Sequence, residues 1–184
     1  AEQIIKLSVR MQKLIEALQT YARSKNQILT FSTALLSECI HNAREQLQGA
    51  IDAKEAQITI GELPAVRCEP ILLTEVFQNL IGNAIKYNES PSPSVMIDAE
   101  RLGSQWCIRV LDNGIGIAPE YAGHIFEPFK RLHGSGRYEG SGLGLAFCRE
   151  IIQHHGGRIW VDANPEGGSI FYLTLAATTE TLPS

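Results

Sequence analysis

Residues 70–87 read PILLTEVFQNLIGNAIKY, and this stretch decides the fold. Proline is common in the first turn of a helix, so the stretch predicts a helix from Pro70 to about Tyr87. At about 100° per residue, one arc of this helix is polar. Its members are Glu75, Asn79, Gly82, Asn83 and Lys86. The opposite side is apolar and is expected to lie on a sheet; it holds Leu73, Val76, Phe77, Leu80 and Ala84.

The polar face of this helix has two interpretations. Such a face on a surface helix is ordinarily only solvated. Asparagine is a poor residue for a helix interior, however, and Gly82 between Asn79 and Asn83 would let a ligand approach the backbone. Mg²⁺ takes few protein oxygens besides phosphates, and an amide oxygen can be one of them. Asn79 or Asn83 is therefore predicted to bind Mg²⁺, and Lys86 to contact phosphate.

A glycine-rich turn, Asp112-Asn-Gly-Ile-Gly116, directly follows a predicted strand. A carboxylate at the end of a strand can accept a hydrogen bond from an exocyclic amine such as that of adenine. An ordinary Asp-Asn-Gly turn is the alternative interpretation.

A second glycine cluster, Gly140-Ser-Gly-Leu-Gly144, leads into a helix predicted at 143–155. Exposed backbone N–H groups at a helix start predict a phosphate-binding loop. Loop residues precede the cluster, which argues against a dinucleotide-binding βαβ unit, and the absence of any GxxxxGK[ST] motif excludes a P-loop.

The rest of the chain predicts an α+β domain, a two-layer sandwich in which helices cover one sheet. A helix is expected to begin near Ser32 or Thr33, which are good N-cap residues, and to end between 49 and 53. We expect this domain to span 28–177 and a flexible tail to follow at 178–184. Strands are predicted at 57–60, 66–68, 95–101, 105–111, 158–162 and 169–175.

The segment 1–27 carries a heptad pattern. Its apolar residues alternate at spacings of three and four, which is typical of a coiled-coil seam, although an amphipathic helix packed on its own domain is the alternative. Pairing of two such helices would give a homodimer through residues 4–21. The seam consists of Ile4, Leu7, Met11, Leu14, Leu18 and Tyr21.

Composition excludes several classes of protein. A net charge of −4 gives no basic field for nucleic acid. No apolar run approaches the roughly 20 residues that cross a bilayer, so no membrane contact by this fragment is expected. The four cysteines have no metal-ligand spacing, which indicates reduced thiols and a cytoplasmic location, whether the full-length protein is soluble or membrane-tethered.

In chain order, these motifs resemble the Bergerat (GHKL) ATP-binding fold of histidine kinases, type II topoisomerases, heat-shock chaperone ATPases and mismatch-repair ATPases. The resemblance covers 70–175 and implies a mixed, mostly antiparallel sheet. The histidine kinase branch is favoured by 79–87, by Ile125-Phe-Glu-Pro-Phe129 and by Gly142-Leu-Gly-Leu-Ala146. The segments 131–133, 138–140 and 156–160 look most like kinases of the phytochrome-related group.

The resemblance implies a role for each matching position. Asn79 would coordinate Mg²⁺, Asp112 would hold the adenine amine, and Glu75 would polarise the acceptor histidine. The segment 130–141 would be a mobile lid, with Lys130, Arg131 or Arg137 reaching the γ-phosphate. The remaining ATP contacts would be Asn83, Lys86, Tyr87, Gly114, Gly116, Ile117, Phe129, Gly140, Ser141, Gly142, Leu143, Gly144 and Ser169.

The segment 10–23 looks like the second helix of a kinase dimerisation domain, but none of the five histidines has the sequence context of the family's acceptor. The expected function is therefore that of the catalytic domain of a sensor histidine kinase. It would transfer the γ-phosphoryl of MgATP to a histidine on a helix absent from this chain, and a response regulator would be a further partner. A non-catalytic nucleotide-binding regulatory module and another ATPase of this fold remain alternatives.

Overall fold

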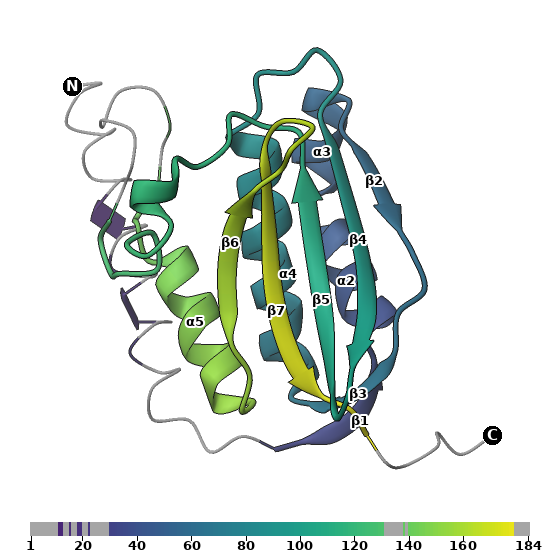
Figure 1. Ribbon diagram of the computed structural model, residues 1–184. Coiled ribbons are helices and arrows are strands. Elements are labelled where there is room, and N and C mark those ends of the chain that lie inside the picture. The colour runs from purple at the N-terminus through teal and green to yellow at the C-terminus, as the bar shows by residue number, and fades with distance from the viewer. Residues whose placement is uncertain are drawn as a thin grey trace.

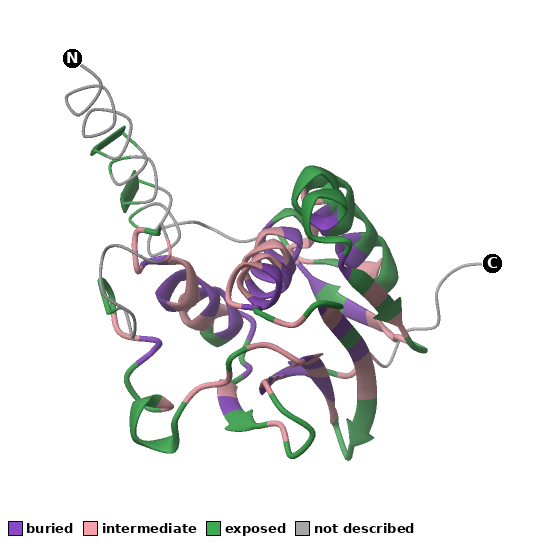
Figure 2. Ribbon diagram, turned by 90° about the horizontal axis from the view of Figure 1, so that it is seen from above, coloured by how far each residue is buried: buried purple, intermediate pink, exposed green. Residues whose placement is uncertain are grey.

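The computed structural model describes residues 11, 12, 15, 18, 19, 22, 30–130, 138 and 140–178. Most of the predicted segment 1–27 and of the tail 178–184 therefore lies outside the described residues. The described part of the domain has two layers, with a sheet in front and helices behind it in Figure 1. Seen from above in Figure 2, the buried residues lie between these layers. The α+β sandwich predicted from the sequence is thus confirmed.

The described residues form a five-stranded sheet in the order β2-β4-β5-β7-β6. β2 pairs with β4 in parallel, and the other neighbours are antiparallel, which confirms a mixed, mostly antiparallel sheet. Ile97, Val110 and Phe171 lie in register across three of these strands and form one apolar row under the helices. The strands span Gln57–Ile60 (β2), Ser94–Leu102 (β4), Gln105–Asp112 (β5), Ile159–Ala163 (β6) and Ser169–Ala176 (β7).

The helix predicted at 70–87 is α4, Pro70–Lys86. Pro70 opens its first turn, and the Glu69 side chain caps it by accepting a hydrogen bond from the Leu72 N–H at 2.7 Å. Phe77 and Leu80 on its apolar side are buried against the sheet and the neighbouring helices. The other helices are α2 (Leu36–Gln46), α3 (Gln48–Lys54), η1 (Pro119–Tyr121) and α5 (Gly144–His154).

The expected helix start near Ser32 or Thr33 is wrong. These residues lie in β1 (Ser32–Leu35), which pairs antiparallel with β3 (Ala65–Cys68). α2 begins only at Leu36, whose N–H donates to the Pro64 carbonyl at 3.1 Å. The backbone carbonyl of Pro64, just before β3, thus accepts the hydrogen bond that the prediction assigned to a side-chain cap. The helix also breaks at Leu47 before continuing as α3.

A buried histidine, His155, connects the end of α5 with the start of α4. His155, at the end of α5, is 8% exposed and accepts a hydrogen bond at Nε2 from the Glu69 N–H at 3.0 Å. Its Nδ1 donates to the Ile151 carbonyl at 2.7 Å, and the edge of its ring meets Phe31 with centroids 5.1 Å apart. The end of α5 is therefore tied to the beginning of α4.

The four cysteines are buried and free, which agrees with the expectation of reduced thiols. No helix within the described ranges is long and apolar enough to cross a membrane.

Candidate functional site

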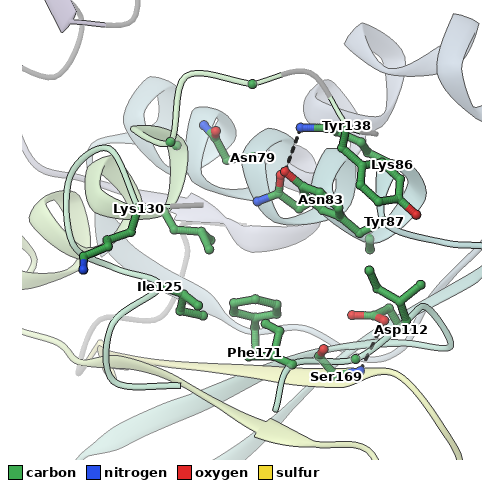
Figure 3. Close-up of a pocket in the computed structure, with 18 of the residues that line it drawn as sticks. Asn79, Asn83, Lys86, Tyr87, Asp112, Ile125, Lys130, Tyr138, Ser169 and Phe171 are labelled. Carbon is green, nitrogen blue, oxygen red and sulfur yellow. Dashed lines mark hydrogen bonds between the residues drawn. The ribbon is translucent and has the colours of Figure 1, made fainter. Parts of the chain in front are cut away.

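A cavity of about 260 Å³ opens between α4, the loop after β5 and the beginning of α5. Figure 3 shows Asn79, Asn83, Lys86 and Tyr87 on one side of it, facing Asp112, Ser169 and Phe171 on the other. The predicted residues that line it are Asn79, Asn83, Lys86, Tyr87, Asp112, Gly116, Ile117, Lys130, Gly140, Ser141, Gly142, Gly144 and Ser169. The structure thus brings together three motifs that lie far apart in the sequence.

Asp112 is the buried acid of the cavity, and 7% of it is exposed. Its Oδ1 accepts hydrogen bonds from the N–H of Gly114 at 2.8 Å and of Ser169 at 3.2 Å. Burial raises the pKa of Asp112, and these two hydrogen bonds partly offset that rise. The second oxygen, Oδ2, makes no hydrogen bond to any described residue, so it can accept a hydrogen bond from an amine in the cavity.

The backbone at position 168 packs so closely against Asp112 that no side chain fits there. Gly168, with a φ of +91°, lies against the Asp112 backbone, and a Cβ there would collide with the Asp112 carbonyl oxygen. Only glycine combines this backbone conformation with this approach. The two glycines before Ser169 therefore allow its N–H to reach the Asp112 carboxylate.

Asn113 fixes the loop that follows α4. Its Oδ1 accepts hydrogen bonds from the Asn88 side chain and from the Ser94 N–H, both at 2.8 Å. Its Nδ2 donates to the Ser92 carbonyl at 3.0 Å. Asn88 is only 1% exposed, so this network is shielded from water. The loop 88–94 is therefore held firmly against the end of β5.

Asn79 presents an amide oxygen to the cavity. Its Nδ2 donates to the Glu75 carbonyl at 2.9 Å, which anchors the side chain and leaves Oδ1 facing Gly144 at the start of α5. A Cβ on Gly144 would collide with this oxygen. The chemistry of Oδ1 fits Mg²⁺, which accepts a single neutral oxygen when phosphates and water complete its shell. Across the described ranges no three acidic, histidine or cysteine side chains gather as a metal site, so such an ion would depend on phosphate.

Lys86 and Tyr87 form the rim of the cavity nearest the end of α4. The Lys86 ammonium donates to the Tyr87 hydroxyl at 2.9 Å and lies 4.4 Å from the centre of the same ring. A Cβ on Gly140 would stand 2.9 Å from Lys86 Nζ, so the glycine cluster passes directly beside this charge. A positive charge and an aromatic ring are thus adjacent at one end of the cavity.

Some predicted site residues lie outside the cavity lining. Gly114 lies behind Asp112 and acts through its backbone N–H. Leu143 is buried, with its N–H bonded to the Ser141 hydroxyl at 3.2 Å. Phe129 is 61% exposed and has a positive φ of 64°. Glu75 lines a neighbouring hollow that also contains Asn79.

The charged residues that were predicted to take part in phosphoryl transfer do not all lie in the cavity. Burial raises the pKa of the Glu75 carboxyl, and the charge of Glu69 raises it further. Lys130 lines the cavity but is largely exposed, with its ammonium 3.5 Å from Glu127 Oε2. Arg131 and Arg137 lie outside the described residues.

The cavity also contains residues that the sequence analysis did not assign to it: Ala84, Ile115, Ile125, Tyr138, Leu145 and Phe171. Two of them could have been assigned from the sequence. Ile125 belongs to a quoted motif, and Phe171 follows Ser169 by two positions, which places it on the same face of β7. Tyr138 lies in a quoted segment and in the expected lid, but its contacts are with residues far away in the sequence, so its place in the cavity was not predicted.

Comparison with known proteins places this geometry in context. Residues 68–179 match the family model described as histidine kinase-, DNA gyrase B-, and HSP90-like ATPase. Over 165 residues the chain is 41% identical to the phytochrome-like protein Cph1 of Synechocystis sp., which covers 90% of this chain. The chain spans only 22% of that relative's length.

Two solved structures have the same fold. The catalytic domain of histidine kinase ThkA, in a nucleotide-free form, matches with a TM-score of 0.70 and 26% identity, over 82% of this chain and 97% of that one. The structure of ThkA in complex with the response regulator TrrA matches with a TM-score of 0.74 and 23% identity, over 95% of this chain and 49% of that one.

Proposed function

Because the chain belongs to the family of histidine kinase-, DNA gyrase B- and HSP90-like ATPases, we propose that its cavity binds MgATP and that the domain is a protein histidine kinase. It would transfer the γ-phosphoryl group to a histidine on a helix outside this chain. The observation that carries the proposal is the position of Asp112, buried opposite Asn79 in one cavity. Asp112 can accept a hydrogen bond from the adenine amine at one end of ATP, and Asn79 can bind the cation that accompanies the phosphates at the other end.

The adenine end is set by Asp112. Its free oxygen accepts the exocyclic amine, while Ile117 and Phe171 supply apolar walls for the ring. Tyr87 flanks the nucleoside from α4. The Ser169 N–H holds the carboxylate in place from the opposite strand. Burial of an acid that lacks a cationic partner within the described residues is costly, and a ligand amine would offset this cost.

The phosphate end is set by α4 and by the start of α5. Asn83 and Lys86 would contact phosphate oxygens, and backbone N–H groups of the loop 140–144, apart from that of Leu143, would surround them. Asn79 would hold Mg²⁺ through Oδ1. When bound, this ion would neutralise charge on the phosphates. Lys130, Arg131 or Arg137 would reach the γ-phosphate when the lid closes.

Transfer itself needs little covalent chemistry from the protein. The P–O bond to ADP breaks as a P–N bond to the acceptor imidazole forms, so positioning of the two partners is the main task. Glu75 lies beside Asn79 in the neighbouring hollow, and its raised pKa makes it a better acceptor for the imidazole N–H. We propose that it polarises the acceptor histidine.

The partners follow from this reaction. An acceptor helix must be supplied by the longer kinase, and the heptad residues Met11 and Leu18, which are helical and exposed, favour a dimer through residues 4–21. The complex of ThkA with a response regulator supports such a regulator as the next partner here. Dependence on ATP and the free thiols favour a cytoplasmic location.

A transfer assay tests the proposal. The chain is mixed with the acceptor-histidine helical domain of a related sensor kinase and with γ-labelled ATP, and label on the acceptor is followed over time. Acid-labile, alkali-stable label on the acceptor is expected, and Asp112→Asn should abolish it. Rapid phosphate release without labelled acceptor would instead indicate an ATPase, and nucleotide binding with neither product would indicate a regulatory module.

A further inference from the structure

Tyr138 bridges the two sides of the cavity rim. It lines the cavity, and the edge of its ring packs on Tyr87 with centroids 4.8 Å apart and the planes at 62°. Its hydroxyl donates to Glu89 Oε1 at 2.8 Å, across 49 residues of sequence. Figure 3 shows Tyr138 beside Tyr87 and Lys86. Tyr138 is thus attached to the end of α4 and to the loop after it by two separate contacts.

The acceptor of this hydrogen bond stands on a rigid support. Glu89 directly follows Asn88, which is 1% exposed and bonded to Asn113 at 2.8 Å. The next residue, Ser90, donates its N–H back to the Asn88 side chain at 2.9 Å. The backbone on both sides of Glu89 is therefore held in place, while its own side chain stays exposed. Holding the backbone keeps the Glu89 side chain within reach of the Tyr138 hydroxyl.

Tyr138 also completes a continuous wall. Gly140 lies beside the Lys86 ammonium, and that ammonium is bonded to the Tyr87 hydroxyl. Tyr138 packs against the ring of Tyr87. All four residues line the cavity, so Tyr138 forms one part of this wall.

We propose that Tyr138 is a positioning residue for the nucleotide, and that its bond to Glu89 slows nucleotide release. The inference rests on the proposed function, because it takes the ligand of this cavity to be ATP. A contact that closes the wall after the ligand has entered acts mainly on the dissociation rate and little on the association rate. The rate of nucleotide release is therefore the quantity to measure.

The test is stopped-flow release of a fluorescent ATP analogue, displaced from the Mg²⁺-loaded chain by excess ATP. Tyr138→Phe keeps the ring on Tyr87 but loses the hydroxyl, so release should be about 3- to 10-fold faster. Tyr138→Ala loses both contacts and should accelerate release by more than about tenfold. Glu89→Ala should accelerate release at least as much as Tyr138→Phe, and Glu89→Gln, which keeps an acceptor oxygen, should recover part of the loss.

The pairing is tested by combining the changes. The double variant Tyr138→Phe with Glu89→Ala should release nucleotide no faster than the faster of the two single variants, because both changes remove the same hydrogen bond. Fully additive effects would overturn the proposed bond as the cause. The matched controls are Tyr121→Phe and Glu120→Ala on η1, exposed residues outside the cavity lining, and neither should change the rate.

Two failures can be told apart. If the unaltered chain binds no ATP analogue, the proposed function fails. If it binds, and Tyr138→Ala leaves the release rate unchanged, the role of Tyr138 is refuted while the nucleotide site stands.

Discussion

The carboxylate of Asp112 at the end of β5 is bonded through Oδ1 to the backbone N–H of Ser169, 57 residues later, at 3.2 Å. This bond joins two strands at the cavity and turns the second carboxylate oxygen toward it. The acid is 7% exposed and paired only with backbone N–H groups within the described residues. Its position is explained by a ligand that donates a hydrogen bond.

Replacing Asp112 with asparagine should remove nucleotide binding and preserve the fold. The amide still fits between Gly114 and Ser169, but an NH₂ group would then face the adenine amine, donor against donor. An unpaired buried donor costs about 1–3 kcal/mol, so affinity should fall by about 5- to 150-fold. Equilibrium dialysis with labelled ATP measures this loss, and circular dichroism checks the fold. Unchanged affinity would refute the adenine assignment.

Asn79→Ala should weaken binding chiefly through the metal. Oδ1 is the predicted Mg²⁺ ligand, so the loss should be large with Mg²⁺ present and small with EDTA. Fluorescence titration under the two conditions gives both affinities. The neighbouring Gln78→Ala, which alters the second hollow and leaves the cavity lining intact, is the control and should show no metal-dependent change. Equal losses for Asn79→Ala in both conditions would count against the metal role.

Gly144→Ala should reduce nucleotide affinity about tenfold or more. The new Cβ collides with Asn79 Oδ1, and Asn79 cannot move without breaking its bond to the Glu75 carbonyl. Gly49→Ala in α3 is the matched control, because a Cβ there meets nothing within 4 Å. That control should raise the free energy of unfolding by about 0.5–1 kcal/mol and leave binding unchanged. Urea unfolding and ATP titration of both variants decide the point; normal binding by Gly144→Ala would show that the contact is unimportant.

His155 should make the domain less stable in mild acid. Burial lowers its pKa from 6.5, although the hydrogen bond to Ile151 and the charge of Glu69 act in the opposite direction and His154 adds to the lowering. The unfolded state therefore binds more protons between the lowered pKa and 6.5, so the stabilisation is present above pH 6.5 and is lost as pH falls through the lowered pKa. Protonated Nε2 could no longer accept from the Glu69 N–H.

Urea unfolding at several pH values checks this linkage. His155→Phe should cost about 1–3 kcal/mol at pH 7.5, since the Glu69 N–H loses its acceptor, and should cost less at lower pH. The control His41→Gln changes an exposed histidine paired only with Glu45 among the described residues, and its effect should be near zero throughout. A cost for His155→Phe that does not depend on pH would contradict the lowered pKa.

The elements that follow local rules could be predicted from the sequence. α4 follows from a proline start and a clean division of polar and apolar positions, and β5 and β7 follow from their alternating residues. The site motifs could be assigned because each combines glycines with one polar residue of fixed chemistry. β1 could not be predicted, since Ser32 also suits a helix cap and only pairing with Cys68 decides between the two.

The part of the site that the sequence did not predict depends on distant contacts. Asn113 interacts with Asn88 and Ser94, and Tyr138 interacts with Tyr87 and Glu89. Neither side chain stands out in a local pattern, because asparagine after aspartate reads as an ordinary turn and a single tyrosine in a loop reads as surface. Such roles emerge only when the topology brings the partners together.

Calorimetric titration with a non-hydrolysable ATP analogue, with and without Mg²⁺, asks whether this cavity binds the nucleotide through its metal. We expect one site per chain, micromolar affinity on the order of −8 kcal/mol with Mg²⁺, and clearly weaker binding without it. Absence of heat at saturating analogue in a folded sample, or binding that Asp112→Asn leaves intact, would contradict it.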